Sequence, residues 1–448
     1  MHVSIIGLGK LGSPMAAVFA SKGCHVVGFD RSAAVVQALR EGRAPVEEPG
    51  LQALIDENRE RISATTDLSA AIAATSVTFV IVPTPSEATG RFSTAAVVDA
   101  VSAIGTALQQ KTDYHLVVVT STVMPGATGG EIQQALESHA GRTLGPTLGL
   151  CYSPEFIALG SVVRDMLRPD MVLIGESDAR AGDLLQSIYA TSCDNQPAVW
   201  RMSFVNAELA KIAVNTFVTT KISYANMLSD VCDRLPGADV DVVTSAIGAD
   251  SRIGSRYLKG ATGYGGPCFP RDNVAFGALA RTLGARAELA EATDSVNRYQ
   301  VERVLGAVEA RATDAGPIGV LGLAYKPDTA VIEESQGLAV ASRLLRQGRR
   351  VIVYDPKALP PARAALGPSV QVAETAADCV AKASLVVVMT PWPEFGRIPL
   401  DAFRRAGRRL TVIDCWRMTP PEVASVADLV FLGMGVDTGS TVGVSTRR

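Results

Sequence analysis

The sequence predicts an α/β protein of two doubly wound parallel-sheet domains joined by a long central helix. Three observations predict this class. The N-terminus reads as a strand, a glycine-rich turn, a helix and a second strand, and short apolar runs ending in polar loops recur in both halves of the chain. Between the halves, residues 204–235 contain neither Gly nor Pro before Pro236 and are rich in apolar side chains. Alternating strands and helices favour parallel sheets, and the uninterrupted run favours one long helix.

The first element is a strand predicted at 2–6, which enters the turn Gly7-Leu8-Gly9-Lys10-Leu11-Gly12. A helix over 13–21 and a strand over 24–29 follow, and this strand ends at Asp30. This order is typical of a Rossmann-like dinucleotide-binding unit, whose glycines let the backbone approach a pyrophosphate. Asp30 is expected to bond the ribose hydroxyls and to favour NAD over NADP, whereas Arg31 could stack on adenine or accept a 2'-phosphate.

Further strands at 77–82 and 116–120 end in the loops Pro83-Thr84-Pro85 and Ser121-Thr122-Val123-Met124-Pro125-Gly126. Ligands of such sheets bind beyond the carboxyl ends of the strands, so both loops are expected on the cofactor side. The second half repeats the pattern with strands at 318–321, 350–354, 384–389 and 410–413. This indicates a duplicated fold, and because the second copy lacks GxGxxG it is predicted to hold a different nucleotide-like ligand or none.

These elements predict the domain boundaries. They are an NAD-binding Rossmann domain at 1–196, a central helical dimerisation domain at 197–298, a C-terminal Rossmann-like domain at 299–438 and a flexible tail at 439–448. The length of the central helix favours a homodimer.

Composition excludes several classes of protein. Of 448 residues, 47% are apolar and 19% charged, which is ordinary for a globular protein, and the net charge of -3 gives no overall attraction to nucleic acid or anionic membranes. The sequence contains no uninterrupted run of about 18 apolar residues, so no membrane span is predicted. Seven scattered cysteines argue against a disulfide framework and a zinc site and favour a cytoplasmic protein, and all four histidines precede residue 140, so no metal is expected.

Two segments carry candidate chemistry. On the central helix Glu208, Lys211, Asn215 and Thr219 fall on one face. They form either a solvated face or a polar stripe from which Lys211 and Asn215 stabilise negative charge on an oxygen.

The second segment runs from Lys259 to Asp272 and contains four glycines and Cys268. The glycines are interpreted as letting backbone amides approach an anionic or sugar ligand. Cys268 is surrounded by glycine and charge, and a cation such as Lys211 or Arg271 can convert a thiol into a nucleophile. The other six cysteines are expected to be small buried side chains.

Together these motifs resemble the UDP-glucose/GDP-mannose dehydrogenase family over nearly the whole chain. Matching segments are Gly7 to Gly12, Glu48-Pro49-Gly50-Leu51, Val82 to Pro85, Ser121-Thr122-Val123, Pro154-Glu155-Phe156, Ala207 to Lys211 with Asn215, Arg252-Ile253-Gly254, Gly265 to Asp272 and Gly322 to Pro327. The resemblance implies two NAD-dependent oxidations at C6 of a nucleotide sugar, UDP-glucose foremost, through a cysteine thiohemiacetal and thioester. It further implies that the central domain carries the catalytic loop and that the C-terminal domain binds a nucleotide sugar.

The resemblance also implies roles for single residues. Catalytic residues would be Cys268, Lys211, Asn215, Asp272, Thr122 and Glu155, the last as acid/base partner in thioester hydrolysis. Cofactor contacts would be Gly7, Leu8, Gly9, Lys10, Leu11, Gly12, Asp30, Arg31, Thr84, Ser121 and Arg271. Substrate contacts would be Glu155, Phe156, Ile157, Lys211, Asn215, Arg252, which reaches a neighbouring subunit's substrate, Tyr257, Lys259, Gly265, Lys326 and Arg417.

Three positions depart from the family pattern. Leu159 stands where many members have a second glutamate, Glu333 where an arginine is usual, and Arg271 where a lysine is common. Three alternatives stay open: the same chemistry on UDP-N-acetylmannosamine, UDP-N-acetylglucosamine or GDP-mannose; a two-electron β-hydroxyacid-type dehydrogenase; and a non-catalytic NAD-sensing module. The cysteine and the C-terminal domain speak against the second, and surface polysaccharide biosynthesis is the pathway that the resemblance suggests.

Overall fold

The computed structural model describes residues 1–312 and 316–435, so the predicted tail at 439–448 lies outside the described residues. The chain divides into two compact units, Met1–Val214 and Asn215–Arg448. Helix α9 (Phe204–Arg234) contributes residues to both units and confirms the long helix predicted between the halves.

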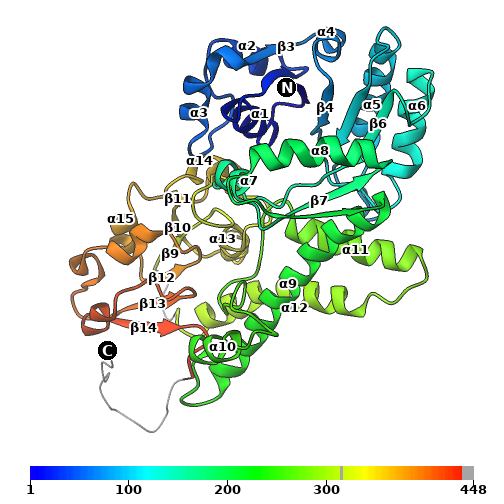
Figure 1. Ribbon diagram of the computed structural model, residues 1–448. Helices are drawn as coiled ribbons and strands as arrows, with labels where there is room; N and C mark the ends of the chain where they lie inside the picture. The colour runs from blue at the N-terminus through cyan, green and yellow to red at the C-terminus, as the bar shows by residue number, and fades with distance from the viewer. Residues whose placement is uncertain (313–315, 436–448) are drawn as a thin grey trace. The chain divides into compact units, whose positions relative to one another are not determined.

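The first unit is built on an eight-stranded sheet in the order β3-β2-β1-β4-β5-β6-β7-β8 (Figure 1). The first six strands are parallel and have the Rossmann order, as predicted. Strand β7 runs antiparallel to β6, so the sheet is not parallel throughout. Strand β8 is parallel to β7 and therefore also runs opposite to the first six strands. The strands are β1 (His2–Ile6), β2 (His25–Phe29), β3 (Ile62–Thr65), β4 (Val77–Val80), β5 (His115–Val119), β6 (Leu148–Tyr152), β7 (Met171–Glu176) and β8 (Ala198–Met202).

Helices cover both faces of this sheet. They are α1 (Gly12–Ser21), α2 (Ala33–Arg40), α3 (Leu51–Glu57), α4 (Leu68–Ala73), α5 (Ala95–Leu108), α6 (Gln133–Ala140), α7 (Val162–Leu167) and α8 (Ala179–Ser192). Successive residues of β5 alternate between two buried clusters: Leu116 and Val118 pack with α1 and α8, whereas Val117 and Val119 pack with α5 and α6. A strand covered on both sides must be apolar throughout, which explains its continuous apolar sequence.

The second unit repeats the topology. Its six-stranded sheet has the order β11-β10-β9-β12-β13-β14, and every neighbouring pair is parallel, which confirms the predicted duplication of the fold. The strands are β9 (Ile318–Leu321), β10 (Val351–Tyr354), β11 (Gln371–Val372), β12 (Leu385–Val388), β13 (Leu410–Asp414) and β14 (Ala427–Phe431). The helices are α10 (Val240–Gly248), α11 (Phe269–Thr282), α12 (Glu288–Glu309), α13 (Gln336–Arg346), α14 (Leu359–Leu366) and α15 (Ala376–Lys382).

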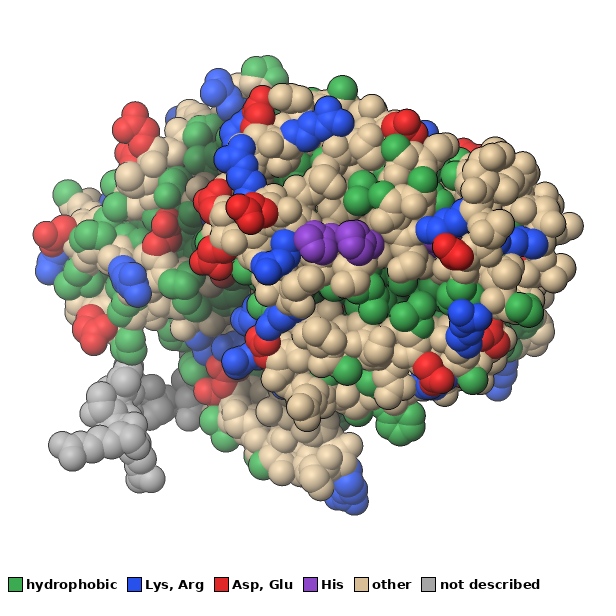
Figure 2. All heavy atoms as spheres, turned by 45° about the horizontal axis from the view of Figure 1, so that its top comes forward, with side chains coloured by type: hydrophobic (Ala, Val, Ile, Leu, Met, Phe, Trp, Pro, Cys, Tyr) green, Lys and Arg blue, Asp and Glu red, His purple; other side chains and the backbone are tan. Residues whose placement is uncertain are grey.

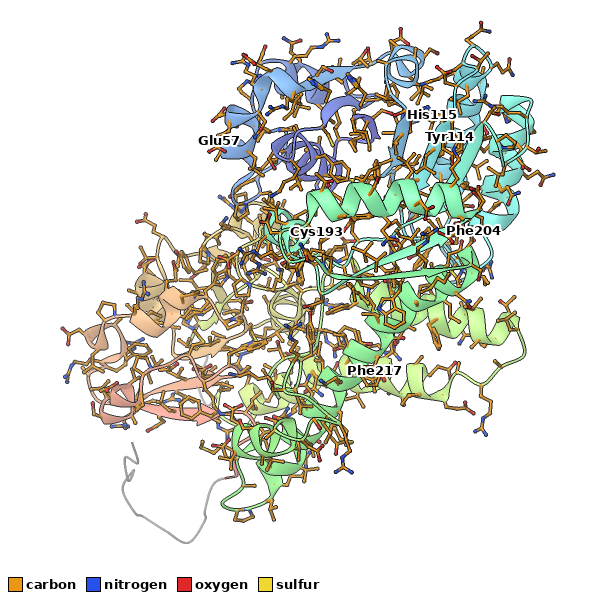
Figure 3. All side chains as sticks on the ribbon, viewed as in Figure 1. Glu57, Tyr114, His115, Cys193, Phe204 and Phe217 are labelled. Carbon is orange, nitrogen blue, oxygen red and sulfur yellow. The ribbon has the colours of Figure 1, made fainter. Side chains whose placement is uncertain are left out.

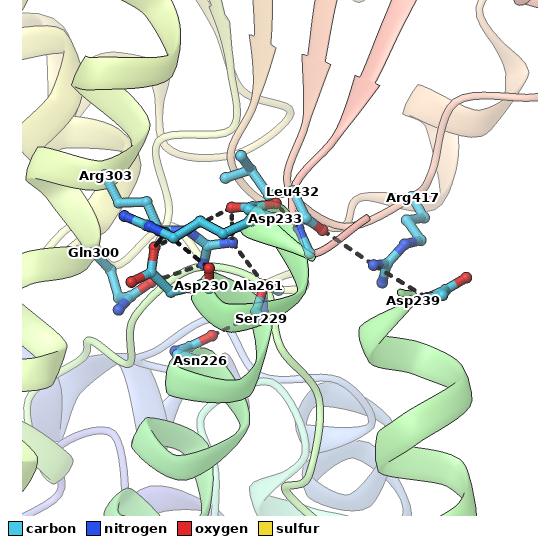
Figure 4. Close-up of polar contacts among 12 residues, drawn as sticks. Asn226, Ser229, Asp230, Asp233, Asp239, Ala261, Gln300, Arg303, Arg417 and Leu432 are labelled. Carbon is cyan, nitrogen blue, oxygen red and sulfur yellow. Dashed lines mark hydrogen bonds and ion pairs between the residues drawn. The ribbon is translucent and has the colours of Figure 1, made fainter. Parts of the chain in front are cut away.

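A buried arginine fixes the helices of the second unit to its sheet (Figure 4). Arg303 of α12 donates to Asp233 Oδ2 of α9 at 2.5 Å and to Ser229 Oγ at 2.8 Å. The second oxygen of Asp233 accepts the backbone N–H of Gly433, just after β14, at 2.5 Å. A charge-assisted network of this kind joins three distant segments in one geometry.

Charge is mixed in sign on the face of the molecule that Figure 2 shows. Figure 2 shows lysine and arginine side chains interspersed with aspartate and glutamate on the face in view, without one broad field. Among residues 1–312 and 316–435, no helix is both long and apolar enough to cross a membrane.

Candidate active site

The glycine turn after β1 is shaped for a close approach of backbone and ligand. Gly7 has φ +98°, and a Cβ there would lie 2.1 Å from the carbonyl oxygen of Ile81; a Cβ on Gly12 would lie 1.8 Å from that of Gly7. A Cβ on Gly9 would meet nothing within 4 Å, which leaves open space beside the turn. Packing therefore requires glycine at positions 7 and 12, while the open space beside Gly9 leaves room for a ligand, as a pyrophosphate-binding turn needs.

Asp30 holds this turn from the end of β2. Its Oδ2 accepts the backbone N–H of Leu8 at 2.8 Å, and its Oδ1 accepts that of Ser32 at 2.8 Å. The carboxylate therefore lies against the middle of the GxGxxG turn, where it fits a role in bonding ribose hydroxyls and repelling a 2'-phosphate.

The corresponding turn of the second unit is closed by its own aspartate. Asp355 is buried, and its Oδ2 accepts the N–H groups of Leu323 and Ala324 at 2.7 and 2.9 Å and the indole N–H of Trp392 at 3.1 Å. Asp355 thus holds its turn as Asp30 does, but it accepts two amides and an indole N–H where Asp30 accepts one amide. The turn Gly322-Leu323-Ala324-Tyr325-Lys326 also lacks the later glycines of GxGxxG, so the second copy differs from the first.

The loops after β4 and β5, both expected on the cofactor side, contact each other. Thr84 Oγ1 donates to the carbonyl of Thr122 at 2.8 Å. Ser121 Oγ accepts the N–H of Val82 at 2.9 Å and donates to its carbonyl at 2.7 Å. Thr84, Ser121 and Thr122 are therefore brought together at the carboxyl edge of the sheet.

The next loop along this edge, after β6, carries Glu155. Its side chain is half-buried, and loss of hydration raises its pKa to about 7, against the lowering effects of a hydrogen bond from Tyr189 and of the charge of Lys211. Tyr189 Oη lies 3.3 Å from Glu155 Oε1. A carboxyl group that titrates near neutral pH can both donate and accept protons, which suits it for acid/base chemistry.

Lys211 of α9 lies over the same loop. Its Nζ donates to the backbone carbonyl of Glu155 at 2.6 Å and lies 4.5 Å from the ring centroid of Phe156. Three residues earlier, buried Glu208 accepts the N–H groups of Gly126 and Thr128 at 2.6 and 2.7 Å. Helix α9 is thus fixed to the loops after β5 and β6, and the alternative of a solvated polar face is wrong.

The nucleophile candidate lies in the second unit. Cys268 is exposed and immediately precedes α11, whereas the other six cysteines are buried, as predicted. Buried Asp272 lies one turn into α11, and its backbone N–H donates to the carbonyl of Cys268 at 2.8 Å. Its side-chain Oδ2 accepts a hydrogen bond from Asn215 Nδ2 at 2.6 Å. The thiol therefore lies at a helix N-terminus, where peptide dipoles favour negative charge.

Two buried asparagines hold the segment that leads to Cys268. Asn226 of α9 accepts the N–H of Ala261 at 2.8 Å and donates to the carbonyl of Thr262 at 3.0 Å. Asn297 of α12 accepts the N–H of Tyr264 at 2.7 Å and donates to its carbonyl at 3.0 Å. Each amide replaces the backbone partner that this irregular segment lacks.

The four glycines of this segment have packing neighbours, which corrects their interpretation as ligand approaches alone. A Cβ on Gly260 would lie 2.7 Å from the carbonyl oxygen of Ala225; on Gly263, 2.5 Å from Asn297 Oδ1; on Gly265, 2.3 Å from the carbonyl oxygen of Glu334; and on Gly266, 2.5 Å from the ring of Tyr325. The glycines are needed because helices and a neighbouring loop press on this backbone.

The remaining predicted substrate residues of the second unit lie in different surroundings. Tyr257 has φ +62°, is 53% exposed and meets the ring of Phe269 edge-on. Lys259 is exposed, Arg252 is exposed and pairs with Asp250 at 2.6 Å, and Lys326 lies half-buried near the Tyr325 ring.

Arg417 is committed to internal partners (Figure 4). Its guanidinium lies 2.7 Å from Asp241 and 3.5 Å from Asp239, and it donates to the carbonyl of Leu432 at 3.0 Å. These contacts give Arg417 a structural position, and its substrate contact stays a prediction, as does a cofactor contact for Arg271, whose Nε lies 3.8 Å from Asp272 Oδ1.

Sequence reasoning missed several residues of this site. Tyr189, Ser153, Asn226 and Asn297 hold the predicted residues in place but belong to no motif, and Tyr189 is 34 positions from the glutamate that it contacts. Asn226 carried a signal, because an amide inside the largely apolar α9 requires a partner, whereas Asn297 stands among the charged and polar residues of α12.

Comparison with known proteins gives the same assignment along the chain. Residues 1–193, 205–299 and 319–421 match the NAD binding, central and UDP binding domains of the UDP-glucose/GDP-mannose dehydrogenase family. The chain belongs to this family. It is an NAD-dependent nucleotide-sugar 6-dehydrogenase, with NAD as its cofactor.

Relatives within the family are similar over almost the full length. The chain is 38% identical to UDP-glucose 6-dehydrogenase AglM of Haloferax volcanii over 92% of this chain and 97% of that protein. It is 33% identical to UDP-glucose 6-dehydrogenase of Rhizobium meliloti over 92% and 94%. The solved structure of a UDP-glucose dehydrogenase from Pyrobaculum islandicum is 34% identical and superposes with a TM-score of 0.89, covering 97% of this chain and 98% of that one.

The positions that depart from the family pattern have clear places in the fold. Leu159 packs against the hydrophobic core of the first unit, so it fills space there as an apolar side chain. Glu333 contributes its backbone carbonyl, which accepts the N–H of Gly266 at 3.0 Å next to the cysteine segment. Its exposed side chain replaces a cation with an anion at this point.

Proposed function

We propose that this enzyme oxidises UDP-glucose at C6 to the uronic acid through a covalent cysteine intermediate. The observation that carries the mechanism is Cys268, the exposed thiol that precedes α11 and is backed by the Asn215–Asp272 pair. The choice of sugar is supported by the relatives named UDP-glucose dehydrogenase, at 38, 33 and 34% identity. A GDP-mannose 6-dehydrogenase of Pseudomonas putida is 31% identical over 79% of this chain, and GDP-mannose is therefore an alternative substrate.

The reaction has four steps: an oxidation, an addition, a second oxidation and a hydrolysis. The C6 alcohol loses a hydride and a proton and becomes an aldehyde. The thiol of Cys268 adds to the aldehyde carbon, forming a C–S bond and a thiohemiacetal. Loss of a second hydride and a proton gives a thioester, and water then cleaves the C–S bond to release the acid and restore the thiol. NAD, when bound, supplies the hydride acceptor of both oxidations; the GxGxxG turn and Asp30 are the residues that would hold it.

The remaining groups act on protons and on charge. Lys211 and Asn215 stabilise the negative oxygen that develops on the tetrahedral carbon. Glu155, whose pKa is raised to about 7 by burial, takes the proton of the water that attacks the thioester. Asp272 and Thr122 orient that water or relay protons. Phe156, Ile157, Tyr257, Lys259, Gly265, Lys326 and Arg417 contact the substrate.

The number of NADH molecules formed per sugar tests this function. The purified protein is incubated with NAD and limiting UDP-glucose, UDP-N-acetylglucosamine, UDP-N-acetylmannosamine or GDP-mannose. Two NADH per UDP-glucose are expected. One per sugar would indicate a two-electron dehydrogenase, two on another sugar would change the substrate, and none with any sugar would leave an NAD-sensing module.

We further propose that the enzyme is a homodimer formed through α9. Phe217, Tyr224, Met227 and Val231 of this helix are 68, 47, 44 and 53% exposed. Their spacing of seven, three and four residues places them on one stripe, and an exposed apolar stripe of this length favours burial against a second copy. Arg252, exposed beside Asp250, is then available to a partner's substrate. The reduced thiol that the mechanism requires favours a cytoplasmic location.

A further inference from the structure

A chain of hydroxyl groups leads from Glu155 into the first unit. Tyr189 Oη of α8 lies 3.3 Å from Glu155 Oε1 and 2.9 Å from Ser153 Oγ. Ser153 Oγ in turn donates to the backbone carbonyl of Leu173 in β7 at 2.9 Å. Tyr189 and Ser153 are buried, with 6 and 1% of their surfaces exposed, so water has little access to either hydroxyl.

The hydrogen count of this chain depends on the protonation of Glu155. When Glu155 is protonated, three hydrogens fill three contacts: Glu155 donates to Tyr189, Tyr189 to Ser153, and Ser153 to Leu173. When Glu155 is ionised, its own proton is gone and only two hydrogens remain for the three contacts. Tyr189 then donates to the carboxylate, and the contact between Tyr189 and Ser153 is left without a hydrogen. The chain ends on a carbonyl, which cannot accept a proton, so it does not conduct protons away.

We propose that Tyr189 and Ser153 are positioning residues that set the proton affinity of Glu155 in opposite directions. Tyr189 stabilises the ionised form, because a hydrogen bond to a carboxylate is stronger than one to a neutral acid. Ser153 stabilises the protonated form of Glu155, because the Tyr189 hydroxyl can donate its hydrogen to Ser153 Oγ only when Glu155 is neutral and donates to Tyr189. The balance lets the carboxyl group change state at the end of each catalytic cycle, an inference that rests on the proposed role of Glu155.

Other charged groups near Glu155 do not reproduce this pattern. Lys211 of α9 donates to the backbone carbonyl of Glu155, and its charge lowers the pKa of the carboxyl group. Burial, and to a lesser extent the charge of Glu155, raises the pKa of Cys193 at the end of α8 to about 11. This thiol is therefore neutral near pH 7. Neither Lys211 nor Cys193 would shift the pKa of Glu155 in opposite directions when Tyr189 and Ser153 are replaced in turn.

The test is to titrate Glu155 directly in the whole protein without substrate. The C=O stretch of a protonated carboxyl group is followed by infrared spectroscopy, and the band missing in Glu155→Gln is assigned to Glu155. Tyr189→Phe is expected to raise the midpoint by about half a pH unit to one unit, and Ser153→Ala to lower it by a similar amount. Shifts in the same direction, or none in either variant, would overturn the proposal.

A matched control is available in the same unit. Tyr114 is a half-buried tyrosine whose hydroxyl oxygen is buried, at the opposite end of the strands from the loop of Glu155, and Figure 3 shows it well apart from Cys193 at the end of α8. Tyr114→Phe is expected to leave the midpoint unchanged. If Tyr189→Phe does not fold, Ser153→Ala still tests the proposal, because its midpoint must lie below that of the native protein. The infrared titration needs no turnover, so it can fail while two NADH per sugar are formed, or succeed when they are not.

The pH dependence of acid formation provides the functional counterpart. If ionised Glu155 activates water, the low-pH limb of the rate moves to higher pH in Tyr189→Phe and to lower pH in Ser153→Ala, following the infrared midpoints. A merely structural effect would lower the rate without moving the limb in opposite directions.

Discussion

The side-chain amide of Asn297 pairs with both backbone groups of Tyr264, accepting from its N–H at 2.7 Å and donating to its carbonyl at 3.0 Å. Asn297 lies on α12, and Tyr264 lies four residues before the cysteine. The conformation of the segment that carries Cys268 is therefore specified by a buried amide that lies 33 positions from Tyr264.

Asn297→Ala is expected to lower the rate of acid formation while leaving NAD binding unchanged, because the cysteine segment loses its support. Two backbone groups would lose their partner, at about 1–3 kcal/mol of unfolding free energy each. Urea unfolding and steady-state kinetics measure the two effects. Asn195→Ala is the control, because its exposed amide makes one bond, to the carbonyl of Pro169. Equal losses in both variants would contradict the assignment.

Cys268→Ala is expected to abolish acid formation, because no thioester can form, and to leave NAD binding intact. Product analysis and calorimetric titration with NAD measure this. Cys232→Ala, which removes a buried thiol of the same unit, should retain acid formation. Unchanged acid output from Cys268→Ala would eliminate the covalent mechanism.

Much of this architecture could be predicted from the sequence, because its strands are buried on both faces. β1, β4, β5, β9 and β12 are mostly apolar runs, and their predicted positions agree with the structure to within a few residues. β8 was not predicted, because its alternating exposed residues, Ala198 to Met202, resemble a loop. β14 was missed because Asp428 interrupts a short apolar run.

The candidate site was predictable only where a motif carried it. The GxGxxG turn, Asp30 and Cys268 could be found because a glycine turn, an acid and a thiol at those positions are typical of ligand binding and catalysis. The partners of Glu155 could not, because Tyr189 is an ordinary apolar-flanked helix residue until folding brings α8 to the loop after β6. The packing of Gly260 and Gly263 against helices likewise depends on tertiary structure.

Asp30→Ala is expected to weaken NAD binding by about tenfold and to reduce the preference for NAD over NADP, because both the turn contact to Leu8 and the negative charge are lost. Asp30→Asn separates these effects, since its amide oxygen can still accept from Leu8 while the charge is gone. Binding of both cofactors is measured by calorimetry. NADP binding that appears in Asp30→Asn and disappears when Arg31→Ala is added would show that Arg31 receives the 2'-phosphate; an unchanged cofactor ratio in both Asp30 variants would refute its role.

Replacing Val231 with glutamate, together with Phe217→Glu, is expected to halve the mass in solution, because charge on the exposed stripe of α9 cannot be buried in a dimer. Sedimentation velocity gives the mass. Val372→Glu, on the edge strand β11 and 36% exposed, is the matched control and should leave the mass unchanged. A double variant that keeps the mass of the native protein would place any dimer contact elsewhere.

His115 should make the stability of the protein depend on pH. It is fully buried at the start of β5, its Nε2 lies 2.7 Å from Thr78 Oγ1, and its Nδ1 lies 3.4 Å from Lys111 Nζ (Figure 3). Burial, with the positive charges of Lys111 and Arg142, lowers its pKa to about 3 from an ordinary value of about 6.5.

The sign of this effect follows from proton binding. Between about pH 6.5 and pH 3 the unfolded chain binds a proton on His115 and the folded protein does not, so acid favours unfolding. The free energy of unfolding is therefore expected to fall as pH is lowered through this range, and His115→Gln should fall less steeply even if it is less stable at pH 7. Urea unfolding at several pH values measures both slopes. His139→Gln, at an exposed position on α6, serves as the control and should keep the native slope; a His115→Gln slope identical to that of the native protein would mean that the buried imidazole is not the group that acid protonates on unfolding.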